Sequence, residues 1–352
     1  MIFAPLSTVE ILEGANQRWF IGAYGSEDRA LGWMKRQERQ RGILDGALMF
    51  RYRHTKGNRN KIADAQGALS RIALNAPRDV VYDARRPFRI EAVLANAFAK
   101  PLSEAREIVL DTSAMTKLLI LTCLCSLRHF SGAVRIVYSE AEDYVPTRHE
   151  YERSKGNMGL IARVPSRGVQ AVVRTECLSS IRMQGQPVTL VAFTSFNEQL
   201  VRHMLGTMSP HRLLFINGRP PRPDYAWRER ATQEIHQRLI EQYTADNDVD
   251  ERGWIKRVAS TLDYRETIDR IEDIYTDFGI RERIICAATG SKMQTVGLFF
   301  AKVLHPDMHI EYPTPDSYFI RGASTGVRKV HELVVPAFSK FLAAAGNGAD
   351  VA

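Results

Sequence analysis

Two stretches of the chain decide its expected fold: Val109-Leu-Asp-Thr-Ser-Ala-Met-Thr-Lys117 and Ile284-Ile-Cys-Ala-Ala-Thr-Gly-Ser-Lys292. Each begins as a short apolar run typical of a buried strand and continues through small and hydroxyl residues to a lysine, after which an apolar helical stretch follows. A strand that leads directly into a helix leaves the first amide groups of that helix without intrahelical partners, which favours a bound anion. The sequence therefore predicts one kind of anion site twice.

The segments around these stretches also recur in the same order, as an internal duplication requires. Residues 19–27 correspond to 190–198, 48–52 to 213–217, 82–85 to 262–265, and 134–138 to 308–312. The last pair ends in Tyr138 and Tyr312, and a second tyrosine follows each after six residues. This order predicts two copies of one module.

Each copy alternates strand-like and helical segments, which favours parallel strands with crossover helices. The predicted fold class is α/β, with two tandem Rossmann-like domains related by a pseudo-two-fold. Long helices are expected over 223–245 and 252–278, and a packing helix over 329–345. The expected parts are a first Rossmann-like half (1–145), a basic connector with a candidate β-hairpin (146–187), a second Rossmann-like half (188–325), and a C-terminal helix with a flexible tail (326–352).

Composition excludes several protein classes. The 352 residues are 45% hydrophobic and 25% charged, with no run of eighteen apolar residues and no signal peptide, so a cytoplasmic protein without a membrane partner is expected. The four cysteines form no CxxC pair and the histidines show no ligand spacing, so neither a disulfide framework nor a metal site is predicted. No cofactor is expected.

The net charge of +8 is concentrated between residues 29 and 61, where ten basic residues face two acidic ones. The loop at 53–60 and its counterpart at 217–222 follow strands on the ligand-binding side of the predicted sheets. They could contact nucleic acid or another polyanion, or form a solvated basic surface, and the sequence leaves both readings open. The candidate polyanion contacts are Arg51, Arg53, Lys56, Arg59, Arg219 and Arg222.

The stretch Ala288-Thr-Gly-Ser-Lys-Met293 resembles a motif of the CARF family, Rossmann-like sensors of cyclic oligonucleotides in CRISPR immunity. Thr194, Ser195 and Asn197 stand where that family has small polar residues after the first strand, and a chain with two such halves is similar to SAVED domains. The resemblance implies a phosphate-bearing ligand such as a cyclic oligonucleotide, a role in prokaryotic antiviral defence, and output through an effector protein partner or oligomerisation. The first half departs from the motif, with Ala114-Met115 in place of glycine.

The candidate ligand-binding residues lie at the two junctions and after the first strand of each half. Hydroxyls there can donate to phosphate oxygens, and a lysine adds charge. Asp111 could be a general base, a ligand contact or a cap, and capping is favoured. No catalytic residue is predicted. The candidates are Ser26, Asp111, Thr112, Ser113, Thr116, Lys117, Ser195, Asn197, Thr289, Gly290, Ser291 and Lys292.

Three function classes remain open at this point: a nucleotide sensor, an enzyme acting on a nucleotide or sugar-nucleotide in an inter-domain cleft, and a nucleic-acid-binding scaffold. A Walker A loop is excluded because Ile285, and not glycine, stands five residues before Gly290. An enzyme of the second class should show an asymmetric pair of titratable groups, and the sequence offers no convincing one. The sensor is therefore preferred.

Overall fold

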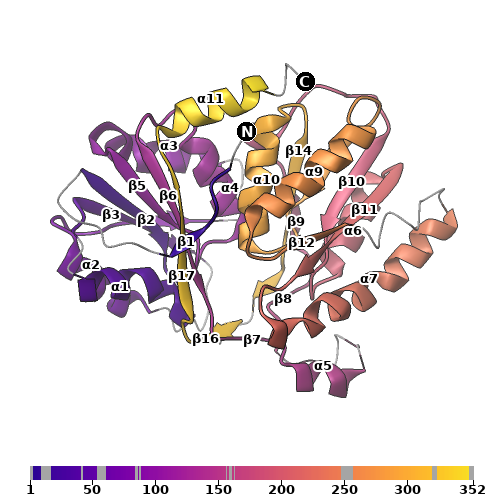
Figure 1. Cartoon of the computed structure of the whole chain (residues 1–352), viewed down its shortest axis with the longest axis horizontal. Coiled ribbons are helices and arrows are strands. Elements are labelled where there is room, and N and C mark those ends of the chain that lie inside the picture. The colour runs from indigo at the N-terminus through magenta and orange to yellow at the C-terminus, as the bar shows by residue number, and fades with distance from the viewer. Residues whose placement is uncertain are drawn as a thin grey trace. The chain divides into compact units, whose positions relative to one another are not determined.

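The computed structural model describes residues 3–8, 17–40, 43–53, 61–83, 86, 89–155, 157, 161, 163–246, 257–318 and 323–348. The chain divides into two compact units, one made of Met1–Tyr144 with Ile320–Ala352, and the other of Val145–Phe319. The second unit is thus inserted into the chain of the first (Figure 1).

The described residues of the first unit form a seven-stranded sheet in the order β1-β17-β6-β5-β2-β3-β4. Strands β2 to β6 are parallel, β17 runs antiparallel to β6, and β1 runs antiparallel to β17. The strands are β1 (Ser7–Thr8), β2 (Arg18–Ala23), β3 (Gly46–Tyr52), β4 (Arg78–Tyr82), β5 (Glu107–Asp111), β6 (Ala133–Glu140) and β17 (Lys329–Val335). The helices are η1 (Asp28–Leu31), α1 (Gly32–Gln40), α2 (Ile62–Ile72), α3 (Ile90–Glu104), α4 (Lys117–Ser126) and α11 (Phe338–Gly348).

The described residues of the second unit form a six-stranded sheet in the order β12-β11-β10-β13-β14-β9. All neighbours are parallel except β9, which runs antiparallel to β14. The strands are β9 (Ala171–Val173), β10 (Val188–Phe193), β11 (Arg212–Arg219), β12 (Val258–Ser260), β13 (Arg283–Ala287) and β14 (His309–Thr314). The helices are α5 (Arg148–Ser154), η4 (Glu176–Leu178), α6 (Gln199–Met208), η5 (Pro223–Tyr225), α7 (Trp227–Asp246), α9 (Tyr264–Phe278) and α10 (Lys292–Leu304).

The five parallel strands of each unit have the same spatial order. Numbered along the chain within each unit, they lie as 3-2-1-4-5, which is the Rossmann order. The predicted fold class is confirmed: the chain is α/β and contains two Rossmann-like sheets. In such sheets ligands bind beyond the carboxyl ends of the strands where strand 1 lies beside strand 4, here β2 with β5 and β10 with β13.

Each sheet has an antiparallel strand next to its fifth parallel strand, which we call its closing strand, and in the first unit the short β1 lies beyond it. In the first unit the closing strand is β17, which follows the second module in the chain, and in the second unit it is β9, which follows the first. Two short ribbons accompany them: β7 (Asp143–Tyr144) pairs with β16 (Ser324–Thr325), and β8 (Ser166–Arg167) with β15 (Ser317–Tyr318). The expected connector at 146–187 therefore adds β9 to the second sheet, where it pairs with β14, and supplies β8 to the separate ribbon with β15. The strands β8 and β9 do not pair with each other.

Two helix predictions were wrong in part. Residues 329–335 form β17, in which Val330 and Leu333 are buried, and a helix begins only at Phe338. Residues 258–260 form β12 beside β11, and α9 begins at Tyr264 behind its N-cap Asp263. In both places the apolar run was too short to distinguish a helical period from a strand period. The tail after residue 348 lies outside the described residues.

Helices α4 and α10 begin at the two predicted junctions and are largely buried. Residues 118–125 of α4 and 293–301 of α10 are buried all along their length, as expected of a helix that is apolar on all sides. Packing therefore holds both helix starts in place. Across the described part of the chain, we find no helix with the length and apolar character needed to cross a membrane.

Candidate functional site

The two predicted junctions have the same construction. Residues 112–116 connect β5 to α4, and residues 288–291 connect β13 to α10. The N-caps are Thr116, whose Oγ1 accepts a hydrogen bond from Leu119 N at 3.3 Å, and Ser291, whose Oγ accepts one from Gln294 N at 3.0 Å. Lys117 and Lys292 are then the first residues of their helices, at the carboxyl end of strand 4 in each sheet.

The position of both lysines favours a negatively charged neighbour. A helix start carries partial positive charge, which opposes a cation in the first turn and attracts an anion. Both side chains are half-buried, and burial lowers the pKa of Lys117 to about 8. An anion bound here would offset the helix dipole and the desolvation of the ammonium group together.

The two junction loops differ in length by one residue. Thr112 N donates to Val137 O of β6, and Ala288 N donates to Glu311 O of β14, so Thr112 and Ala288 are structural equivalents. The first loop (112–116) is therefore one residue longer than the second (288–291). The two sites are similar but not identical.

Four of the predicted residues of the first junction bond within the protein. Asp111 Oδ1 accepts from Ser113 N at 2.9 Å, so Asp111 stabilises the loop, whereas Thr116 caps the helix. Thr112 Oγ1 donates to Val137 O at 2.8 Å, and Ser113 Oγ accepts from Ser139 N at 2.8 Å. Thr112 and Ser113 are fully buried, so their hydroxyls hold the loop against β6.

Tyr52, at the end of β3, is a residue of the first junction that sequence reasoning missed. Its hydroxyl accepts from Thr116 N at 2.8 Å and donates to Ala114 O at 3.2 Å. The Tyr52 hydroxyl is thus the hydrogen-bond acceptor of the backbone amide of the N-cap residue, Thr116. A lone tyrosine at a strand end carries no motif, and only the parallel register brings it to this helix start.

In the second junction, Thr289 joins the two strands that flank the ligand-binding edge. Its Oγ1 donates to Phe193 O at 2.7 Å and accepts from Phe193 N at 2.9 Å. Gly290 is packed so closely that a Cβ there would lie 2.9 Å from Phe193 Cβ and closer still to Gln294 Oε1. Ser291 N donates to that same Gln294 Oε1 at 2.8 Å, which completes a capping box. The glycine is thus explained by close packing around the helix start.

The polar residues after the first strand of the second unit hold the segment around β8. Asn197 Nδ2 donates to Ser166 Oγ at 3.2 Å and to Gly168 O at 3.3 Å. Ser195 Oγ accepts from Asn197 N at 3.4 Å and fixes the turn. In the first unit, Ser26 occupies the corresponding loop between β2 and η1 and is half-buried.

The predicted polyanion contacts that the structure describes lie in ion pairs with acidic residues of their own unit. Each pair has a partly exposed partner, and such pairs contribute about 0–1 kcal/mol, so a polyanion could compete for them. Lys56 and Arg59 lie outside the described residues. The pairs are Arg51 with Asp79, Arg53 with Asp83 at 3.5 Å, Arg219 with Glu266 at 2.8 Å, and Arg222 with Asp224.

Within the described ranges, no group of three or more histidine, cysteine or acidic side chains is placed to hold a metal ion.

No protein-family model and no curated protein matches the chain. Among solved structures, the chain is similar to a type III CRISPR defence DNA nuclease activated by cyclic oligoadenylate. The TM-score is 0.43 with 11% sequence identity, over 88% of this chain and 68% of that chain. The likeness is distant.

Proposed function

We propose that the chain is a sensor of a phosphate-bearing nucleotide, in which Lys117 and Lys292 each bind phosphate at the start of a helix. The observation that carries the proposal is the repeated junction. In each unit a capped helix begins with a lysine, after β5 in the first unit and after β13 in the second. The resemblance of residues 288–293 to the CARF motif makes a cyclic oligonucleotide the proposed ligand. A role in prokaryotic defence, with output through a partner protein or oligomerisation, completes the proposal.

The side chains of each junction have different roles in this proposal. The lysine supplies charge, and Ser291 fixes the start of α10, since its hydroxyl also donates to Thr261 O at 2.7 Å. Thr116 accepts from Leu119 N through its oxygen, and its hydroxyl proton can be donated to a phosphate oxygen. Thr112, Ser113 and Thr289 shape the loops that present these groups.

The site geometry gives less support to the other two function classes. Asp111, the acidic candidate for a general base, bonds the amide of Ser113 within its own loop. Arg51 and Arg219, candidate contacts for a polyanion, bond carboxylates of their own unit, which a polyanion would have to displace. The sensor is therefore the function that the arrangement of these residues supports best.

The test is a substitution of Lys292 by alanine. A charge-assisted hydrogen bond contributes about 1.5–3 kcal/mol, so we expect Lys292→Ala to weaken nucleotide binding by roughly tenfold or more. Binding is measured by thermal shift and calorimetry against pyrophosphate, ATP, and linear and cyclic oligoadenylates.

The matched control is Lys302→Ala, because Lys302 lies in the last turn of the same helix and its Nζ donates to Pro306 O at 2.5 Å. The control should bind as the parent protein does. Equal affinity in the parent and in Lys292→Ala would exclude Lys292 from the site.

A further inference from the structure

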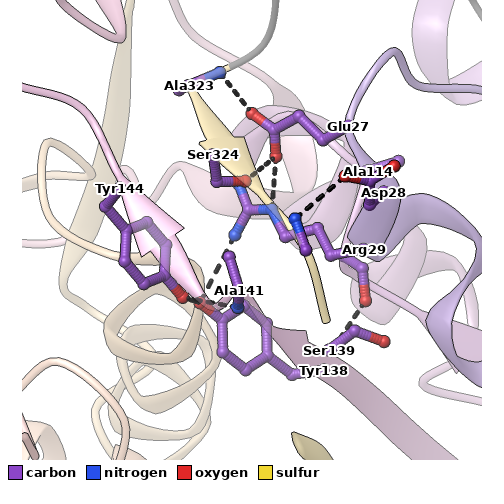
Figure 2. A network of polar contacts seen from close by, with 12 residues as sticks. Glu27, Asp28, Arg29, Ala114, Tyr138, Ser139, Ala141, Tyr144, Ala323 and Ser324 are labelled. Atoms are coloured by element: carbon purple, nitrogen blue, oxygen red, sulfur yellow. Dashed lines mark hydrogen bonds and ion pairs between the residues drawn. The ribbon is translucent and has the colours of Figure 1, made fainter. Parts of the chain in front are cut away.

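Two adjacent carboxylates at the start of η1 hold the segment through which the chain returns to the first unit, residues 323–326. Glu27 Oε1 accepts from Ala323 N at 2.8 Å, and Glu27 Oε2 accepts from Ser324 Oγ at 2.8 Å (Figure 2). Asp28 Oδ2 accepts from Gly326 N at 2.9 Å. We call these two carboxylates and residues 323–326 the latch.

The latch is also tied to β6 and β7. Arg29 pairs with Glu27, and its Nη1 donates to Tyr138 Oη at 3.4 Å (Figure 2). The hydroxyls of Tyr138 and Tyr144 lie 3.3 Å apart, and Tyr144 in β7 pairs with Ser324 in β16. The contacts therefore form a closed path from η1 through β6 and β7 back to the returning segment.

The second unit contains the counterpart of the latch, built from neutral side chains. Asn197 bonds Ser166 and Gly168, and Gln199 Oε1 accepts from Gly168 N at 2.9 Å. Gly168 and Gly326 both have positive φ, 64° and 68°. The same turn is thus held by amides in one unit and by carboxylates in the other.

Charge sets the first latch apart. Glu27 is paired with Arg29, and Asp28 with Lys61. The Lys61 ammonium and the Gly326 amide lower the pKa of Asp28. Each carboxylate of the latch is therefore paired with a cation that another anion could attract.

The loop that carries Glu27 and Asp28 packs against the loop of the first junction. Gly25, two residues before Glu27, packs against the loop after β5, and a Cβ on it would lie 2.9 Å from Ala114 Cβ. Lys61 N donates to Gly25 O at 3.2 Å. The loop that carries the latch carboxylates therefore touches the loop that leads to Lys117.

We propose that the latch is a release device, in which an anion bound at the first junction draws Arg29 and Lys61 away from Glu27 and Asp28 and loosens residues 323–326. The effect of ligand rests on the proposed function. Each phosphodiester of a cyclic oligonucleotide carries one negative charge and competes with a single carboxylate for each cation. Release of residues 323–326 loosens the entry to β17, which lies between β1 and β6. The output of sensing is then more frequent separation of β17 from its neighbouring strands.

The first experiment needs no ligand. Hydrogen exchange of the full chain is measured by mass spectrometry for the parent protein and for the double variant Glu27→Gln, Asp28→Asn. We expect amides of residues 323–335 to exchange at least tenfold faster in the double variant, while residues 107–126 and the second unit stay unchanged. The control is Glu38→Gln, which removes an exposed ion pair with Arg71 in the same unit and should leave residues 323–335 protected.

Unchanged exchange at 323–335 in the double variant, or equal acceleration throughout the first unit, would overturn the latch.

The second experiment adds cyclic oligoadenylate as the probe. We expect faster exchange at 323–326 in the parent protein and no change in Lys117→Ala. Binding seen by thermal shift without a change in exchange overturns the coupling and leaves sensing intact. Failure of every nucleotide probe to bind overturns the sensing proposal and the coupling, while the variant comparison still decides whether the latch holds the segment.

Discussion

Lys117 and Lys292 are cations placed at the end of a helix where a cation is least stable. Burial lowers the pKa of Lys117 to about 8 from the ordinary 10.5. A group with this pKa changes charge within an accessible pH range. The charge of the proposed phosphate site can therefore be altered by pH alone.

Above pH 8, binding of an anion at Lys117 must be coupled to uptake of a proton, because the anion stabilises the protonated amine and the free protein has lost that proton. We expect the affinity of the Lys292→Ala protein for sulfate, an anion whose own charge does not change in this range, to be constant below about pH 7.5 and to fall by up to about tenfold per pH unit above pH 8. Calorimetric titrations between pH 6.5 and 9.5 measure this profile. Lys117→Arg in the same background keeps its charge throughout and should give a flat profile, so parallel curves for the two proteins would show that another group titrates.

The start of α10 shows how an element can require a residue for reasons unrelated to a ligand. Gly290 is among the predicted ligand-binding residues, and the space that a Cβ on it would take is filled by Phe193 and Gln294. Gln294 is 1% exposed and completes the capping box with Ser291. A ligand at this junction therefore meets a helix start whose geometry the capping box and Phe193 determine.

Gly290→Ala should destabilise the protein by about 1–3 kcal/mol, because the new methyl group overpacks against Phe193 and forces Gln294 out of the capping box. Gly206→Ala is the matched comparison, since Gly206 lies in α6 with nothing within 4 Å of an added Cβ. Alanine there should stabilise the helix by about 1 kcal/mol. Urea unfolding midpoints measure both effects, and a Gly290→Ala protein as stable as its parent would show that the capping box can rearrange.

Sequence reasoning found the junctions because their pattern is local. A buried strand, hydroxyl residues and an apolar helix follow one another within about fifteen residues. Thr116 and Ser291, predicted as ligand-binding hydroxyls, are the N-caps, whereas the cap role predicted for Asp111 was wrong. The contacts that it missed join distant residues. Thr112 reaches Val137, 25 positions away, and Glu27 reaches Ser324, 297 positions away. Such partners leave no periodic signal, so neither the burial of Thr112 nor the latch could be read from the pattern.

At the scale of the whole molecule, the boundaries of the two compact units do not coincide with the boundaries of the two repeated modules. The duplicated modules follow one another, yet each sheet is closed by a strand that follows the other module, β17 in the first unit and β9 in the second. The parallel strands were predictable because they alternate with helices along the sequence of each module. The closing strands were not, since β17 pairs with β6 across about 190 positions of chain.

The insertion predicts which pieces of the chain fold alone. Tyr144 and Ser324 are cross-strand partners, so residues 1–144 joined to residues 323–352 by a short Gly-Ser linker should fold with one cooperative thermal transition. Residues 1–144 alone lack β17, whose Val330, Leu333 and Val335 are each less than 5% exposed. Burial of one such side chain contributes about 1.5–3 kcal/mol, and losing three removes much of the stability of a typical domain. Circular dichroism and calorimetry should therefore show a cooperative transition for the joined chain and none for residues 1–144, and equal transitions would mean that β17 is dispensable for the first unit.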